Sequence, residues 1–221
     1  MISFSQVTVR KNGREILSDI SLRLDERRIG IIGRNGSGKT TFARLFNGLE
    51  KPSLGSIQFA GTRNGADLRT EVGFVFQNPD NQIVYPIVGE DLAFGLRKRG
   101  LSKAVVEERI VSALAYFKIE HLRNCLTHQI SGGERQLVAL AGVLIMQPRL
   151  IVFDEPTTLL DLANKRQLMR TIANLQQHVV IVSHDLELLR DFDRVIYFEG
   201  GRIVGDGRPE GVIDEYIARS Q

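Results

Sequence analysis

Hydrophobic and polar positions alternate over short segments near the start of the chain and recur at helical spacing further on. Alternation with a period of two residues, together with short apolar runs, predicts strands over 2–9, 16–24, 29–32, 56–60 and 72–76. The pair Asn12-Gly13 lies between the first two segments and predicts that they form a hairpin. From 88 to about 140 the pattern is helical, and Ser102 is placed to cap one of these helices.

The second half of the chain alternates between strand-like and helix-like segments. The pattern predicts, in order, a strand over 150–153, a helix over 162–176, a strand over 179–182, a helix over 186–192 and a strand over 194–198. This alternation indicates a parallel sheet with helices on its faces, and residues 201–221 add a short strand and a helix. The predicted fold is an α/β core with an antiparallel β edge and a helical insertion at about 80–145, in a single domain over 1–221.

Composition narrows the class of protein only a little. The 221 residues suffice for a buried core, and 43% hydrophobic with 25% charged residues is typical of a globular protein. A formal net charge of +3 gives no support for nucleic-acid binding. The single cysteine, Cys125, fits a reducing compartment. Because the start lacks a signal-peptide pattern and the longest apolar run, 137–146, is about half of a membrane span, we expect a soluble or peripheral protein.

The segment between the strand predicted at 29–32 and a helix predicted at 41–47 fits the phosphate-binding P-loop pattern G-x-x-x-x-G-K-[ST]. Its glycines let successive backbone N–H groups converge, while the helix start and Lys39 add positive charge for the β- and γ-phosphates. Thr40 can offer its hydroxyl to Mg²⁺. We predict that a nucleoside triphosphate binds at Gly33, Arg34, Asn35, Gly36, Ser37, Gly38, Lys39, Thr40 and Thr41.

A P-loop alone leaves kinases, GTPases and motor ATPases open, and a second motif narrows the choice. The apolar strand predicted at 150–153 ends in Asp154 and Glu155, which is the Walker B pattern. Asp154 at the strand tip can hold the Mg²⁺ shell, and Glu155 can orient and deprotonate an attacking water. These two acids predict a hydrolase.

Four further sequence motifs accompany the P-loop and the Walker B pattern. Ser131-Gly132-Gly133-Glu134 precedes a helix predicted at 135–146 and has capping-box spacing. Gln77 follows the strand predicted at 72–76, Asp161 lies six residues beyond Glu155, and His184 follows the strand at 179–182. In order and approximate spacing the whole set resembles the ABC-type ATPases, where these features are the signature motif, Q-loop, D-loop and switch histidine. Ile130 and Glu134-Arg135-Gln136 replace the commoner L-S-G-G-Q form.

This resemblance implies a P-loop NTPase fold, ATP and Mg²⁺ as cofactors, and hydrolysis with Glu155 and His184 as catalytic residues. It places Gln77 with Thr40 and Asp154 at the metal. It also implies that a second ATPase subunit, identical or a close paralogue, supplies Ser131, Gly132, Gly133 and Glu134 across the γ-phosphate. In that arrangement a helix N-terminus completes the triphosphate's coordination only when two subunits close.

Within the family, the run Phe76-Gln77-Asn78-Pro79-Asp80-Asn81-Gln82 resembles the ATPases of energy-coupling factor transporters, which import vitamins and metal ions. The compact chain looks most like the ATPase of the tripartite biotin transporter. The implied partners are a transmembrane coupling protein and a substrate-binding membrane protein, at the cytoplasmic face of the cell membrane, with no nucleic acid. Residues 80–99 are expected to meet the coupling protein, with Tyr85, Ile87 and Val88 exposed beside Arg97, Lys98 and Arg99.

One departure and several alternatives accompany this interpretation. Family members carry an aromatic residue after the first strand that stacks on adenine, and Arg10-Lys11 falls there instead. Cobalt, nickel or conventional importers remain alternatives, and neither the substrate nor the identity of the second ATPase follows from the sequence. A soluble ABC ATPase acting on nucleic acid is disfavoured because no second domain or coiled-coil insertion is seen. A nucleotide sensor without turnover is disfavoured because Glu155 and His184 are both in place.

Overall fold

The computed structural model describes residues 2–59, 62–63, 68–158 and 160–220, apart from the side chains of 62, 63 and 98. The chain divides into two compact units, which are described separately. The first unit takes its described residues from 1–74, 149–155 and 177–221, and the second from 75–148 and 156–176. Among the described residues, no helix has the length and apolar character that crossing a membrane requires.

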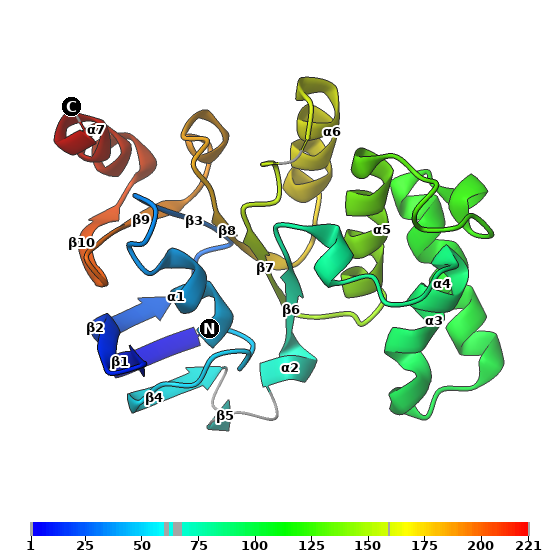
Figure 1. The fold of residues 1–221 in the computed structure, drawn as a ribbon, viewed down its shortest axis with the longest axis horizontal. Helices are drawn as coiled ribbons and strands as arrows, with labels where there is room; N and C mark the ends of the chain where they lie inside the picture. Colours follow the sequence, from blue (N-terminus) through cyan, green and yellow to red (C-terminus); the bar gives the residue numbers. More distant parts are fainter. Residues whose placement is uncertain (1, 60–61, 64–67, 159, 221) are drawn as a thin grey trace. The chain divides into compact units, whose positions relative to one another are not determined.

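A six-stranded sheet forms the centre of the first unit (Figure 1). Its spatial order is β10 (Arg202–Gly207), β9 (Arg194–Glu199), β3 (Arg28–Gly33), β8 (His178–Val182), β7 (Leu150–Asp154) and β6 (Val72–Val75). Strand β3 pairs in parallel with β8 and β9, β7 pairs in parallel with β8, and β10 is antiparallel to β9. The four central strands are almost wholly buried, as their continuous apolar runs require. The predicted parallel sheet is confirmed.

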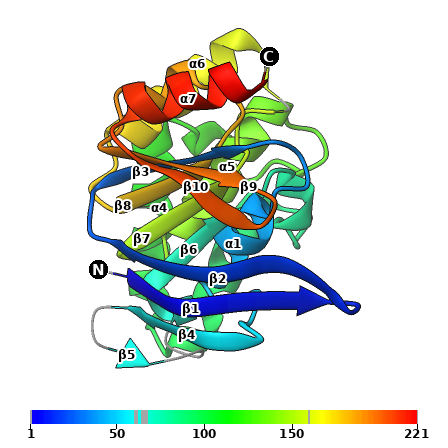
Figure 2. The same ribbon diagram turned by 90° about the vertical axis from the view of Figure 1, so that its left-hand side faces the viewer.

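A four-stranded antiparallel sheet lies in the same unit (Figure 2). Its order is β2 (Arg14–Leu24), β1 (Ile2–Lys11), β4 (Leu54–Phe59) and β5 (Thr62–Arg63). Asn12 and Gly13 join β1 to β2 with positive φ angles of 49° and 75°, the conformation that a two-residue hairpin turn requires. The predicted hairpin and antiparallel edge are confirmed. The strand predicted at 56–60 begins earlier, at Leu54, and residue 60 lies outside the described residues.

Four phenylalanines join the helix α1 (Lys39–Leu45) to both sheets. Phe42 of α1 packs against Phe4 of β1 and Phe198 of β9, each with ring centroids 4.8 Å apart. Phe46, just beyond α1, completes the cluster at 5.1 Å from Phe4 and 5.2 Å from Phe42. All four rings are buried. Because burial of each ring stabilises by about 1.5–3 kcal/mol, the cluster fixes the helix that follows the phosphate-binding loop.

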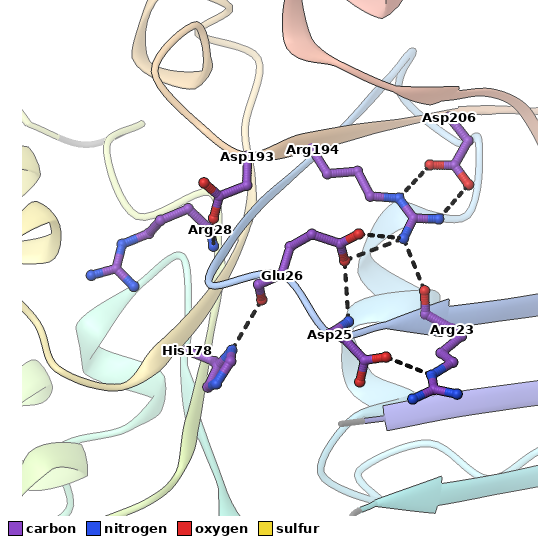
Figure 3. Close-up of polar contacts among 8 residues, drawn as sticks. All are labelled: Arg23, Asp25, Glu26, Arg28, His178, Asp193, Arg194 and Asp206. Atoms are coloured by element: carbon purple, nitrogen blue, oxygen red, sulfur yellow. Dashed lines mark hydrogen bonds and ion pairs between the residues drawn. The ribbon is translucent and has the colours of Figure 1, made fainter.

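Figure 3 shows a polar network around Arg194 at the start of β9. Its guanidinium donates two hydrogen bonds of 2.6 Å to the carboxylate of Asp206 on β10. It also donates to Glu26 Oε1 at 3.0 Å and to the carbonyl of Arg23 at 2.9 Å. Hydrogen bonding to Asp206 raises the pKa of Arg194 despite its partial burial. The network therefore ties β9 and β10 to the end of β2 and to the linker between β2 and β3.

The first unit ends with α7 (Pro209–Ser220), which packs on β9 and β10. The prediction of a helix at 186–192 is wrong, because the structure has a 3-10 turn there, η4 (Glu187–Leu189). Strand β8 ends at Val182 and β9 begins at Arg194, so the connection must also hold the turn at Ser183 and the contact of Asp193 with Arg28 N at 2.7 Å. A crossover with a full helix needs about 10–12 residues or more, and these contacts leave fewer than that.

The second unit is mainly helical, and Figure 1 shows α3, α4 and α5 grouped together. Ser102 caps α4 by accepting a hydrogen bond from Val105 N at 3.4 Å, as predicted. The helix predicted at 135–146 begins earlier because Ser131 caps it, and the one predicted at 162–176 ends at Ala173. The helices and 3-10 turns of the second unit are η1 (Pro79–Asn81), α3 (Val88–Leu96), η2 (Arg97–Arg99), α4 (Lys103–Phe117), η3 (Glu120–Leu122), α5 (Gly132–Leu144) and α6 (Leu162–Ala173). The short helix α2 (Leu68–Glu71) belongs to the first unit.

Candidate functional site

The predicted phosphate-binding loop joins the carboxyl end of β3 to α1 in the first unit. Gly33, Gly36 and Gly38 have φ angles of 148°, 79° and 101°, which other residues rarely adopt. At Gly33 there is also no space, because a Cβ atom would lie 2.2 Å from the carbonyl oxygen of Phe198. These glycines allow the backbone to turn sharply at the sheet edge.

Lys39 lies inside this loop and is only 5% exposed. Its Nζ donates hydrogen bonds to the carbonyl oxygens of Gly33 at 2.7 Å and Arg34 at 2.9 Å. Burial lowers the pKa of Lys39, while the nearby carboxylates of Glu155 and Asp154 raise it. A buried ammonium whose hydrogen bonds go to neutral carbonyl groups is well placed to take an anionic partner.

Ser37 supplies a second sign that the loop is built for a ligand. Its hydroxyl is buried and has no hydrogen-bond partner among the described residues. Ser37 N donates to the carbonyl of Arg34 at 3.2 Å, and its own carbonyl accepts from Gly201 N at 3.1 Å. The backbone of Ser37 is thus fixed while its hydroxyl lacks the partner that a buried polar group normally has.

Thr40 and Asp154 come together from α1 and the end of β7. Thr40 Oγ1 donates to Asp154 Oδ1 at 3.1 Å, and Asp154 is 5% exposed. Burial raises the pKa of Asp154, although the Thr40 hydroxyl lowers it. A hydroxyl and a buried carboxylate side by side are hard oxygen donors, and a cation would relieve the cost of burying the ionised carboxylate.

Glu155 and His184 face each other from the ends of β7 and β8. His184 Nε2 lies 2.9 Å from Glu155 Oε1. Glu155 has a φ angle of 50°, unusual for a residue with a side chain, and its N–H donates to the Val182 carbonyl at 2.9 Å. Backbone strain of this kind costs about 1–3 kcal/mol and clusters at functional sites. The structure therefore joins two residues that the sequence proposed separately, beside Asp154.

The predicted signature segment begins α5 in the second unit. Ser131 Oγ accepts from Glu134 N at 3.3 Å, and Glu134 Oε2 accepts from Ser131 N at 2.8 Å, which is a complete capping box. The Ser131 hydrogen bonds lower the pKa of Glu134. Gly132 has open space around it, whereas a Cβ atom on Gly133 would lie 2.5 Å from Asn164 Cγ.

Asn164 links the signature segment to the predicted D-loop. Asp161 caps α6 by accepting from Asn164 N at 2.8 Å, and Asn164 Nδ2 donates to the other carboxylate oxygen at 3.1 Å. Asn164 is therefore held by Asp161 while its amide packs against Gly133. Nothing in the local sequence around Asn164 marks its contact with α5, so its place in the site could not be predicted.

Gln77 is exposed at the start of the segment that follows β6, and it belongs to the second unit. Downstream of it, Asp80 Oδ1 accepts from Arg135 of α5 at 3.0 Å. Gln82 Nε2 donates to the carbonyl of Ala139 at 2.6 Å. The side chains of Asp80 and Gln82 therefore connect the motif at 76–82 to α5. Neither contact could be predicted from the sequence.

Arg10 and Lys11, at the position expected to hold an aromatic residue, are both engaged elsewhere. Arg10 Nη2 pairs with Glu15 across the hairpin at 3.2 Å. Lys11 pairs with Glu50. Both side chains are therefore occupied in ion pairs.

The geometry agrees with a known family. The family model described as ABC transporter matches residues 17–158, well over half of the chain. The chain belongs to the ABC transporter family. As a member it is an ATPase that serves transport, and the predicted P-loop fold is confirmed.

Three similar proteins show where this ABC ATPase lies within the family. The biotin transport ATP-binding protein BioM of Rhizobium etli is 46% identical, over 97% of each chain. The energy-coupling factor transporter ATP-binding protein EcfA1 of Caldanaerobacter subterraneus subsp. tengcongensis is 38% identical, over 97% of this chain and 81% of the relative. The structure of cbiO1 from Clostridium perfringens, part of the ABC transporter complex cbiONQ, matches with a TM-score of 0.87 and 31% identity, over 99% of this chain and 93% of the other.

Proposed function

We propose that this chain is the ATP-hydrolysing subunit of an energy-coupling factor importer. The observation that carries the catalytic part is the pair of Glu155 and His184 beside Asp154 and the buried Lys39. The motif at 76–82, the relatives named BioM and EcfA1, and the likeness to cbiO1 support the importer class.

The proposed reaction is hydrolysis of ATP to ADP and phosphate. Lys39 exchanges its two carbonyl contacts for oxygens of the β- and γ-phosphates, and the loop N–H groups bind the same anion. Glu155 takes a proton from a water molecule, whose oxygen attacks the γ-phosphorus as the bond to the leaving ADP oxygen breaks. His184 holds the Glu155 carboxylate in place and reaches toward the γ-phosphate.

Mg²⁺ fits the donors at the end of β7. Thr40 Oγ1 and Asp154 would hold the ion, directly or through water. When bound, Mg²⁺ neutralises charge on the phosphate oxygens.

The signature segment of a second subunit would complete this site. Ser131 has a hydroxyl at the N-terminus of α5, and Gly132 leaves its backbone open to an approaching anion. Closure of two subunits around ATP and reopening after loss of the γ-phosphate would drive the membrane partners.

Biotin is the substrate that the relatives favour, with cobalt or nickel as the alternative. The test is uptake by membranes that contain this chain with the membrane proteins encoded beside its gene. We expect ATP-dependent accumulation of labelled biotin that stops when Glu155 is changed to Gln. Accumulation of cobalt or nickel instead would overturn the substrate but keep the importer class. Co-purification of this chain with nucleic acid and no membrane protein would contradict the importer class itself.

The expected contact with the coupling protein needs one correction. Val88 is fully buried, and Tyr85 and Ile87 are only partly exposed, so the three do not form an exposed patch. Val88 begins α3 and points into the core with Leu92, which is why the exposed apolar residues lie elsewhere. The side chain of Lys98 lies outside the described part.

We define instead a docking face made of the exposed apolar residues Val84 and Phe94, with the partly exposed Tyr85 and the exposed Arg97. Val84 and Phe94 are 69% and 41% exposed. The rings of Tyr85 and Phe94 lie 5.0 Å apart, and Arg97 stacks over the Tyr85 ring at 5.1 Å while donating to its hydroxyl. Next to the docking face is a groove of about 640 Å³ between α3 and α4. Apolar residues rimmed by charge suit a helix of a membrane protein.

Changing Tyr85 to Ala together with Phe94 to Ser should weaken co-purification with the coupling protein by about tenfold or more, because the aromatic anchors are lost. ATP binding by the isolated chain should stay unchanged. Val111→Ala is the matched control, because Val111 is 47% exposed on α4 away from this face. If complex formation and uptake survive both changes, the contact lies elsewhere. Val88→Asp is unsuitable, because it would bury a charge.

Selectivity for the base should be modest. Base stacking on an aromatic ring contributes about 1–3 kcal/mol, and Arg10 is committed to Glu15 instead. We expect GTP to compete with ATP within about tenfold of its affinity, measured by displacement of a fluorescent ATP analogue. Exclusive binding of ATP would show that another group holds adenine.

A further inference from the structure

A second groove, of about 720 Å³, lies between the C-terminal end of α4 and α6, within the second unit. Three cations line it, and its described lining residues include no carboxylate. Tyr116 forms part of the wall with half of its surface exposed, and its hydroxyl donates to the Asn174 carbonyl at 3.5 Å. We call this site the basic groove and define it by Tyr116, Lys118, Arg166, Gln167, Arg170 and Asn174.

The cations of the basic groove have no acidic partner in the described part of the chain. Lys118, Arg166 and Arg170 are exposed, and none of them forms an ion pair there. Arg166 and Arg170 are one helical turn apart on α6, so their charges repel each other. Residues 162–176 contain no aspartate or glutamate that could offset them. The arrangement costs stability and would be relieved by an anion.

The groove between α3 and α4, beside the docking face, differs from the basic groove in its charged residues and in its position along α4. Its lining includes the carboxylates of Glu90 and Glu107, and Glu107 accepts two hydrogen bonds from Arg123, one of them 2.8 Å long. That groove meets α4 from Lys103 to Ile110, whereas the basic groove meets it at 116–118. The two stretches of α4 are about 9 Å apart along the helix axis, and the two grooves share no lining residue, so they are separate sites.

We propose that the basic groove binds an acidic segment of a protein partner, at a site separate from the docking face. Its cations are exposed and no buried charged group anchors a small ion, so a free phosphate would gain little there. Two arginines one turn apart match two carboxylates on a partner chain, each able to form a forked pair. The exposed ring of Tyr116 adds the apolar contact that is typical of a protein interface.

The test measures binding of a fluorescent oligo-glutamate peptide to the full chain, with the nucleotide site saturated by a non-hydrolysable ATP analogue. We expect binding that weakens with salt and that falls about tenfold or more in the double variant Arg166→Glu with Arg170→Glu. The matched control, Lys51→Glu with Arg208→Glu, changes two exposed cations of the first unit and should bind as the natural chain does. Since all four positions are exposed, the melting temperatures should agree closely.

A charge-swapped probe makes the result specific. An oligo-lysine peptide should bind the Arg166→Glu, Arg170→Glu variant more tightly than the natural chain. Equal loss of oligo-glutamate binding in the control variant would overturn the proposal, because attraction would then follow net charge alone. A second result would also overturn the proposal. It is binding of phosphatidylglycerol vesicles or inorganic polyphosphate that requires Arg166 and Arg170 and that oligo-glutamate does not displace.

Discussion

Replacing Glu155 with Gln should lower the rate of ATP hydrolysis by about a hundredfold or more and leave ATP binding intact. The amide cannot accept the proton of the attacking water, while Lys39, Thr40 and the loop N–H groups are unchanged. Steady-state phosphate release measures turnover, and a fluorescent ATP analogue measures affinity. Hydrolysis at the natural rate would show that Glu155 is not the base.

The same variant should accumulate as a closed dimer in ATP and Mg²⁺, because hydrolysis is the step that releases it. Size-exclusion chromatography with and without ATP detects the change. Glu187→Gln is the matched control, since Glu187 is an exposed acid of the first unit that pairs with Arg190. This control should hydrolyse ATP normally and remain monomeric after turnover.

Replacing Lys39 with Ala should reduce kcat/KM for ATP by about 10²–10³-fold. The substitution removes the buried charge that we propose faces the β- and γ-phosphates. It also removes the hydrogen bonds to the carbonyls of Gly33 and Arg34, so loop folding must be checked by circular dichroism and thermal melting.

Two further variants distinguish the loss of the Lys39 charge from the loss of its packing. Lys39→Met keeps most of the buried volume and should lose activity as severely as Lys39→Ala, because it too lacks the ammonium. Lys51→Ala removes an exposed lysine of the same unit and should have no effect. Unchanged ATP affinity and turnover in both Lys39 variants would remove the assignment of this loop to phosphate binding.

Much of the candidate site could be predicted because each part is a local pattern. The P-loop at 33–40 combines required glycines with a strand before it and a helix after it, so sequence alone places it at a sheet edge. Asp154, Glu155 and His184 each follow an apolar strand, and parallel strands end on the same edge. Their convergence, including the 2.9 Å contact of His184 with Glu155, follows from that topology.

The rest depends on packing between segments that are distant in sequence. No local pattern indicates that Asp80 pairs with Arg135, 55 residues away, or that Asn164 packs on Gly133. The burial of Val88 was not predicted for the same reason, because it depends on how α3 packs against α4 and α5. The helix expected at 186–192 failed because the connection from β8 to β9 must also hold the contact between Asp193 and Arg28.

The network around Arg194 has a consequence for how the first unit unfolds. Its guanidinium bonds at once to β10, to the end of β2 and to the linker that enters β3, so the detachment of any one of these segments breaks a charge-assisted hydrogen bond. Local opening at this edge is therefore coupled to loss of the strand that carries the P-loop. The two sheets of the unit should melt as one cooperative structure rather than peel apart strand by strand.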